Sequence, residues 1–90
     1  MRTPSYSGQF KHDVKLAEKR GKDMNKLRDI MGLLLAGLPL PRELGDHPLK
    51  GDWKTRRDLH IEPDWLLIYR ADDETVHFDR TGTHSDLFGK

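Results

Sequence analysis

The spacing of the apolar residues changes midway along this sequence. Up to residue 38 they recur every three or four positions, which is the period of a helix with one buried face. From residue 53 onward they mostly alternate with polar residues, which is the period of a half-buried strand. Helical periodicity followed by strand periodicity predicts an α+β domain whose helices pack against a single sheet.

Two helices are expected in the first half of the chain. Ser7 is placed to cap the first of them, and Gly21 ends it. Asp23 is placed to cap the second, which is stopped by Gly37 and by the prolines that follow it. The apolar positions of the first helix are Phe10, Val14 and Ala17, and those of the second are Met24, Leu27, Met31, Leu34 and Leu38.

The second half predicts three strands joined by turns. In the first of these strands one face is apolar and the other polar, with Arg57 as an exception on the apolar face that we expect near an edge or in a salt bridge. The apolar face holds Trp53, Leu59 and Ile61, and the polar face holds Lys54, Arg56, Asp58 and His60. Residues 65–69 are apolar at odd and even positions alike, which indicates a central strand that is covered on both faces. In the last strand, residues 75–81, Val76 and Phe78 alternate with polar residues.

A short extended segment at residues 4–6 and a short helix after Thr83 complete the element order β-α-α-β-β-β plus a C-terminal helix. We expect one domain spanning residues 1–90, with both long helices on one face of a mostly antiparallel sheet. The opposite face would carry the polar side chains of the strand that begins at Trp53. Residues 41–51, which contain two glycines and two prolines, are expected to form a loop.

The composition excludes several classes of protein. The chain has no cysteine, so it offers no disulfide, no thiol nucleophile and no thiolate metal site. No apolar run approaches the roughly 18 residues that a membrane span requires, and the first ten residues do not resemble a secretory signal. These observations predict a cytoplasmic protein.

The charge is unevenly distributed although the formal net charge is only +1. Residues 1–30 contain eight lysine and arginine residues against four acidic ones, whereas the remainder of the chain is acidic overall. A basic segment of this kind is compatible with binding to a phosphate backbone. A solvated helix face explains the same charges equally well.

Three histidines of the second half lie in polar segments with charged or turn-forming neighbours: His47, His60 and His84. Imidazole exchanges protons near neutral pH, so such residues are candidates for acid–base chemistry. If the last two strands pair in antiparallel fashion, the exit of the last strand returns beside Asp64. The topology therefore predicts that His60, Asp64, Arg80 and His84 gather at one rim of the sheet, with His47 supplied by the preceding loop.

These residue types meet the needs of RNA cleavage by transesterification. A base must remove the proton of the 2′-hydroxyl, an acid must protonate the leaving 5′-oxygen, and a guanidinium can stabilise the phosphorane. This chemistry requires no metal ion and no other cofactor.

Each candidate also has a plain structural explanation. The three histidines are also compatible with surface positions, and Asp64 follows a proline as turn residues often do. Arg80 is compatible with a salt bridge to Asp79 or Asp58, and Phe88 with a core anchor. A zinc site of three histidines and an aspartate lacks the short histidine spacing of known sites.

The chain resembles the YafQ branch of the RelE/ParE toxin superfamily, the toxin half of type II toxin–antitoxin pairs. The resemblance runs through YSGQFKHDVKLAEKRGKDMNKL, DHPLKGDWKTRRDLHIEPDWLLIY and RTGTHSDLFG. It implies a compact RelE-like α+β fold and an endoribonuclease that cleaves mRNA in the A site of the bacterial ribosome. It also implies a cognate ribbon-helix-helix antitoxin, which assembles with the toxin as a heterotetramer and supplies the DNA-binding part.

The resemblance also assigns residues by position. Catalytic positions of the family fall on His47, His60, Asp64 and His84, and supporting positions fall on Asp58, Arg80 and Phe88. In this interpretation His84 is the general acid, and His60, assisted by Asp64, is the base or orients the 2′-hydroxyl. His47 contacts phosphate or serves as an alternative base, Arg80 stabilises the phosphorane, and Phe88 stacks or shapes the pocket. The expected contacts to ribosomal RNA are Lys11, Lys15, Lys19, Arg20 and Lys22.

Two other functions fit the same scaffold. One is a non-catalytic inhibitor like the ParE branch, which poisons gyrase, and the other is a plain RNA- or ribosome-binding module. Neither needs an acid and a base that converge on one point. The histidine set is therefore the feature that favours an enzyme.

Overall fold

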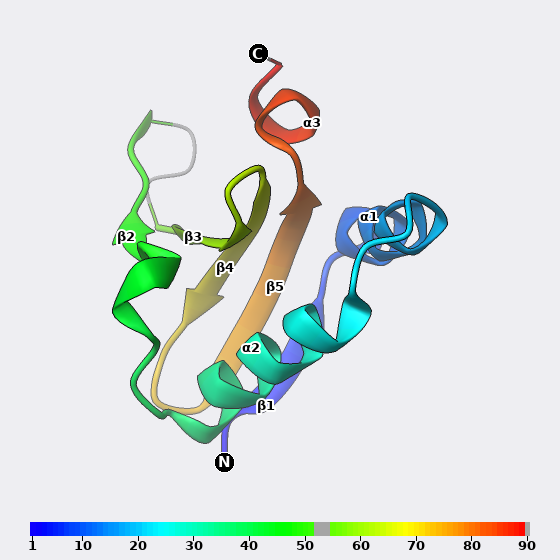
Figure 1. Cartoon of the computed structure of the whole chain (residues 1–90). Coiled ribbons are helices and arrows are strands. Elements are labelled where there is room, and N and C mark those ends of the chain that lie inside the picture. Colours follow the sequence, from blue (N-terminus) through cyan, green and yellow to red (C-terminus); the bar gives the residue numbers. More distant parts are fainter. Residues whose placement is uncertain (52–54, 90) are drawn as a thin grey trace.

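The computed structural model describes residues 1–51 and 55–89 and shows two helices packed on one face of a five-stranded sheet (Figure 1). The order of strands in the sheet is β1-β5-β4-β3-β2. Strands β3 (Arg57–Glu62), β4 (Trp65–Ala71) and β5 (Thr75–Gly82) are antiparallel neighbours, while β1 (Thr3–Tyr6) runs parallel to β5. The predicted α+β class with a mostly antiparallel sheet is confirmed. Trp53 and Lys54, which were expected to begin β3, lie outside the described residues.

The two long helices begin where their capping residues predict. The Ser7 hydroxyl accepts the backbone N–H of Phe10 at the start of α1 (Gly8–Lys19), and the Asp23 carboxylate accepts that of Asn25 at the start of α2 (Met24–Ala36). Gly37 ends α2 in a left-handed conformation with φ of 69°.

The predicted stripe of α2 is wrong at its last position. Because the left-handed turn at Gly37 ends the helix, Leu38 leaves the apolar face and is 55% exposed. Ile30, which the stripe omitted, is buried instead.

The main core lies between the helices and the sheet. Leu59, Trp65, Leu67 and Phe78 from the strands pack there against the buried faces of α1 and α2. The Phe78 ring also stacks against Tyr6 and Phe10, with ring centroids 5.6 and 5.7 Å away. This stacking joins β1 and α1 to the centre of the sheet.

A second, smaller apolar cluster covers the other face of β4. Leu66 and Ile68 pack there against Leu87 of α3 (His84–Phe88), with Leu49 and Phe88 at the border. All five residues from Trp65 to Tyr69 are buried, so the expected burial of this strand on both faces is confirmed. Asp58 and His60 of β3 lie on this face, as expected of its polar side chains, and α3 and the segment around Leu49 also pack against it.

The predicted loop at residues 41–51 contains regular structure. A 3₁₀ turn, η1 (Arg42–Leu44), is followed by a two-residue strand, β2 (His47–Pro48), which pairs with β3 at the edge of the sheet. Proline is tolerated in an edge strand because its missing N–H can face away from the ladder. Within the described part of the chain, no helix combines the length and the apolar character needed to cross a membrane.

Candidate active site

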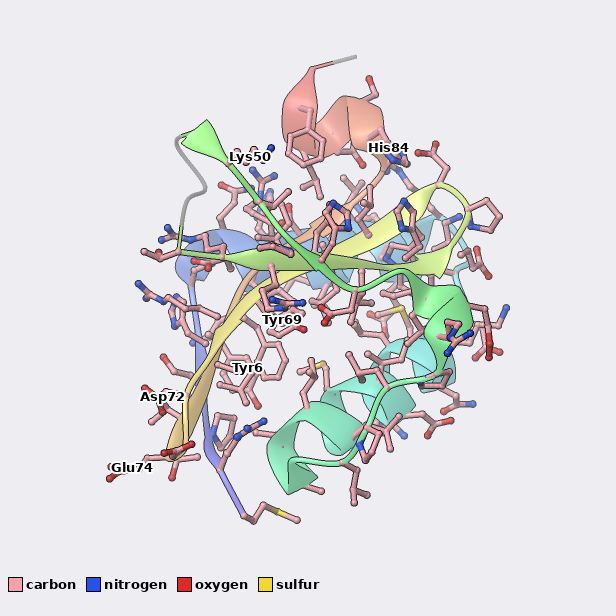
Figure 2. The ribbon with its side chains drawn as sticks, turned by 90° about the vertical axis from the view of Figure 1, so that its left-hand side faces the viewer. Tyr6, Lys50, Tyr69, Asp72, Glu74 and His84 are labelled. Atoms are coloured by element: carbon pink, nitrogen blue, oxygen red, sulfur yellow. The ribbon has the colours of Figure 1, made fainter. Side chains whose placement is uncertain are left out.

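The structure gathers three imidazoles and two carboxylates at one end of the sheet. We call this group the histidine rim: His47, Asp58, His60, Asp64 and His84. The rim residues come from β2, from β3, from the turn between β3 and β4, and from the first turn of α3. Figure 2 shows His84 at the end of the sheet that is opposite to Asp72 and Glu74.

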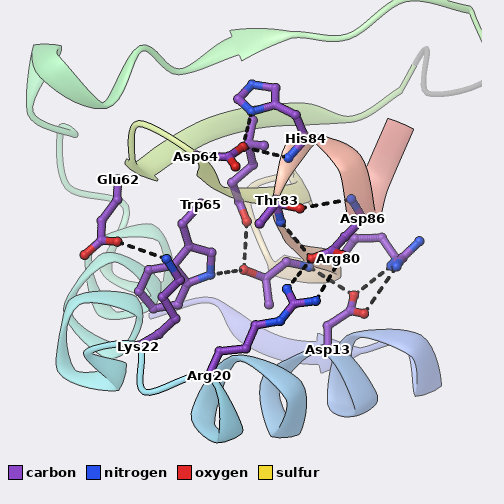
Figure 3. Close-up of polar contacts among 12 residues, drawn as sticks. Asp13, Arg20, Lys22, Glu62, Asp64, Trp65, Arg80, Thr83, His84 and Asp86 are labelled. Carbon is purple, nitrogen blue, oxygen red and sulfur yellow. Dashed lines mark hydrogen bonds and ion pairs between the residues drawn. The ribbon is translucent and has the colours of Figure 1, made fainter. Parts of the chain in front are cut away.

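Asp64 and His84 form a directly bonded pair (Figure 3). The Nδ1 atom of His84 lies 2.6 Å from Asp64 Oδ1, and the backbone N–H of His84 donates to the same oxygen at 3.0 Å. The backbone N–H first and the ring second lower the pKa of Asp64. The carboxylate is therefore an acceptor at neutral pH, which places a proton on Nδ1 and leaves Nε2 to exchange protons.

His60 lies next to this pair. Its ring centroid is 5.5 Å from that of His84, and the two rings are tilted by 39°. The geometry does not show the expected assistance of His60 by Asp64, because among the described residues the carboxylate of Asp64 accepts its hydrogen bonds from the backbone and ring of His84. His60 instead lies against Gly45, where an added Cβ would approach its Nδ1 to 3.7 Å.

His47 lies above a buried carboxylate. Its Nδ1 is 2.9 Å from Asp58 Oδ1 and 2.9 Å from the carbonyl oxygen of Gly45. The first contact has the distance of an ion pair, but Asp58 Oδ1 accepts no well-aligned hydrogen bond from the described residues.

Asp58 itself is only 3% exposed, and burial raises its pKa, against the opposing effect of His47 and His60. A carboxylate with little access to water therefore lies beneath the imidazoles.

Arg80 is directed to α1. Its Nε donates to Asp13 Oδ2 at 2.7 Å and its Nη2 donates to Asp13 Oδ1 at 3.2 Å (Figure 3). The sequence suggested Asp79 or Asp58 as salt-bridge partners, and this was wrong. The paired register between β1 and β5 ends at Phe78, and α1 packs against β5. Arg80 lies beyond that register, which brings it within reach of Asp13.

Asp13 is one of the residues of this region that the sequence pattern did not single out. It is 6% exposed and also accepts the backbone N–H of Thr81. A signal was present, because Asp13 lies on the same helical face as Phe10 and Ala17, where an acid needs a buried partner. Phe88 packs against the small apolar cluster, as a core anchor does.

The five residues that were expected to contact ribosomal RNA divide into two groups. Arg20 is paired with Asp86 at 2.6 Å, and Lys22 with Glu62 at 3.4 Å. Lys11, Lys15 and Lys19 are exposed on α1. Among the described residues, no group of three or more histidine, aspartate or glutamate side chains is arranged to hold a metal ion.

The helix that carries His84 is secured by Asp86. The Thr83 hydroxyl accepts the backbone N–H of Asp86, and the Asp86 carboxylate accepts that of Thr83. The Arg20 side chain, followed by the Thr83 N–H, lowers the pKa of Asp86 to about 2.

We expect the free energy of unfolding to depend on the charge of Asp86. Its folded pKa lies below its ordinary value of 3.8, so its stabilising effect is complete above that value and is lost as the pH falls toward 2. In urea titrations across this range, the Asp86→Asn variant should show a flatter pH dependence than the wild type. Asp29→Asn, which changes an exposed carboxylate of α2, should leave the slope unchanged. Equal slopes for wild type and Asp86→Asn would contradict the expectation.

A small α+β domain with converging imidazoles and carboxylates defines a candidate for acid–base chemistry. Residues 2–89 match the family model described as "Bacterial toxin of type II toxin-antitoxin system, YafQ". The chain therefore belongs to the YafQ toxin family.

Individual relatives agree with this assignment. The chain is 60% identical over 85 residues to the mRNA interferase toxin YafQ of Escherichia coli. The matched region covers 93% of this chain and 92% of that protein. Its structure superposes on the crystal structure of Escherichia coli YafQ with a TM-score of 0.93 at 57% identity, covering 99% of this chain and 100% of that one. A crystal structure of the Escherichia coli DinJ-YafQ toxin-antitoxin complex gives a TM-score of 0.91 at 58% identity, covering 98% of each chain. The predicted family and the predicted enzyme class, an endoribonuclease toxin, are confirmed.

Proposed function

We propose that this chain cleaves mRNA in the A site of the bacterial ribosome by metal-independent transesterification. The observation that carries the proposal is the Asp64–His84 pair, whose Nε2 atom is left for proton exchange next to a second imidazole, that of His60. The mRNA interferase relative supports the choice of substrate. The toxin thereby stops translation.

The reaction divides among the residues of the histidine rim. His60 removes the proton of the 2′-hydroxyl or orients this group, and the 2′-oxygen then attacks the phosphorus. The bond from phosphorus to the 5′-oxygen breaks, and His84 donates its Nε2 proton to that oxygen. The products are a 2′,3′-cyclic phosphate and a 5′-hydroxyl, so atoms and protons balance without a co-reactant. His47 contacts the phosphate or serves as an alternative base.

Three further residues support this step. Asp58 supplies negative charge beneath His47 and His60. Arg80 uses two of its N–H groups on Asp13, and we assign its remaining N–H groups to the phosphorane oxygens. Phe88 shapes the pocket at the end of α3 or stacks on a base.

Basic residues of the first third would bind the toxin to the ribosome. Lys11, Lys15 and Lys19 are exposed on α1 and contact ribosomal RNA in this proposal, together with Arg20 and Lys22 near its end. Arg20 and Lys22 are already paired with acids, so we expect them to contribute less.

A partner protein completes the system. The structure of the DinJ-YafQ complex of a relative supports a cognate antitoxin that neutralises this chain. We propose that this antitoxin has a ribbon-helix-helix part, forms a heterotetramer with the toxin and provides the only contact with DNA. Toxin action on ribosomes places the protein in the cytoplasm.

Product analysis tests the proposal directly. A translated message incubated with the toxin in the presence of a chelator, and with enough Mg²⁺ to maintain ribosomes, should yield 2′,3′-cyclic phosphate and 5′-hydroxyl ends at the A-site codon. Cleavage that requires a transition metal would contradict the mechanism. Intact RNA with arrested DNA supercoiling would instead support the ParE-like inhibitor, and ribosome binding without cleavage would support a binding module.

A further inference from the structure

We propose that Asp46 is a positioning residue that holds His47 at the histidine rim through bonds made on the opposite face of the sheet. The effect on RNA cleavage rests on the proposed function, but the placement of the His47 ring does not. His47 lies in a two-residue edge strand that contains a proline. Such a short strand forms few backbone hydrogen bonds and cannot fix a side chain by itself.

The side chain of Asp46, the residue before β2, forms hydrogen bonds that compensate for the few backbone hydrogen bonds of this strand. The Arg57 Nη2 atom donates to Asp46 Oδ2 at 2.9 Å, and Arg57 Nε donates to both carboxylate oxygens at 3.2 and 3.3 Å. The Tyr69 hydroxyl donates to Asp46 Oδ1. Both oxygens of this carboxylate are therefore bound, one of them by a residue of the main core.

Tyr69 is a rigid attachment point for this network. It is 2% exposed and packs in the main core cluster on the helix side of the sheet. Burial, followed by its bond to Asp46, raises the pKa of the Tyr69 phenol. The phenol therefore remains a proton donor to Asp46 throughout the neutral range.

Adjacent residues of an extended segment point to opposite faces of a sheet. Asp46 is bound by Tyr69 on the helix side, so His47 is directed to the other side, where it meets Asp58. The preceding residue contributes as well, because the carbonyl oxygen of Gly45 lies 2.9 Å from His47 Nδ1. A carbonyl only accepts, so Nδ1 carries the proton and Nε2 is left to contact substrate.

The first test observes the ring of His47 by ¹⁵N nuclear magnetic resonance. In the wild type its nitrogen shifts should report a single form with the proton on Nδ1. Asp46→Asn presents an amide N–H₂ to the guanidinium of Arg57, so the network weakens and the shifts should become an average of both tautomers. His12, an exposed residue of α1, should be unchanged. An unchanged His47 spectrum in Asp46→Asn would overturn the proposal.

The second test is a double-mutant cycle on mRNA cleavage. A small misplacement of a reacting group can cost up to about 10²-fold in rate, and we expect Asp46→Asn to cost about 10-fold. In a His47→Ala background the same substitution should cost less than about twofold, because its effect passes through His47. Equal losses in both backgrounds would overturn the proposal. If the wild-type chain cleaves no RNA, the proposed function fails while the resonance test still decides the role of Asp46.

Two variants control for folding. Tyr69→Phe removes only the hydroxyl that binds Asp46 and should change the His47 spectrum in the same direction. Asp72→Asn alters a carboxylate that accepts three hydrogen bonds from Glu74 and Thr75 at the opposite end of the sheet (Figure 2). It should leave both the His47 spectrum and the cleavage rate unchanged.

Discussion

Replacing His84 with alanine is expected to lower the rate of mRNA cleavage by about 10²- to 10⁴-fold, the usual contribution of a positioned acid or base. The His84 Nδ1 atom is committed to Asp64, and its Nε2 atom is the group that we assign as proton donor to the 5′-oxygen. The substituted protein should remain folded, because the cap of α3 is formed by Thr83 and Asp86 and not by the imidazole. Single-turnover cleavage of a translated message measures the effect.

A modified substrate separates the acid from other roles. When the 5′-oxygen at the cleavage site is replaced by sulfur, the leaving group departs without needing a proton. His84→Ala should then regain most of its lost rate relative to the wild type. His12→Ala is the matched control, since His12 is an exposed histidine of α1. A folded His84→Ala protein with full activity on the normal substrate would remove the assignment of His84 as the acid.

The helices and the central strand were predictable because their signals are local. Ser7 and Asp23 cap the helices through hydrogen bonds to residues two or three positions later in the chain. The apolar run from Trp65 to Tyr69 needs no partner to be recognised as doubly buried. In each case the interaction that decides the structure is encoded within a few neighbouring residues.

The pairing of side chains was less predictable because it depends on direction as well as proximity. Strand topology placed Asp64 near both His60 and His84, but only the entry of the chain into α3 brings the His84 N–H and ring to the same oxygen. Arg80 binds Asp13, which lies 67 residues away in the sequence. The contact is possible because β1 pairs with β5 only as far as Phe78 and does not cover the part of β5 that carries Arg80. Alternation along a strand reports the face of a side chain and not its partner.

The burial of Asp58 also could not be predicted from the alternation of residues along its strand. Its position in β3 alternates with apolar residues, which predicts a solvent-facing polar side chain. The residue is buried because β2 pairs directly beside it and α3 packs over the same face of the sheet. A two-residue strand has no periodicity to detect, so the cover over Asp58 was absent from the sequence pattern.

Replacing His60 with alanine is the second change for which we expect a loss of about 10²- to 10⁴-fold in cleavage rate. Its ring is 5.5 Å from that of His84, close enough for two imidazoles to act on opposite sides of one phosphodiester. The base acts on the 2′-hydroxyl, so its loss should not be relieved when the leaving 5′-oxygen is replaced by sulfur. His60→Ala should therefore stay impaired on the modified substrate that restores His84→Ala.

The two variants thus give opposite results on one substrate pair, and a shared fold defect cannot produce that pattern. The pH–rate profile adds an independent check, because an acid and a base together produce a bell-shaped dependence. Loss of His60 should remove the dependence on the acidic side, where the base becomes protonated, while loss of His84 should remove the dependence on the alkaline side. Recovery of His60→Ala on the sulfur-containing substrate would exchange the two roles and assign the acid to His60.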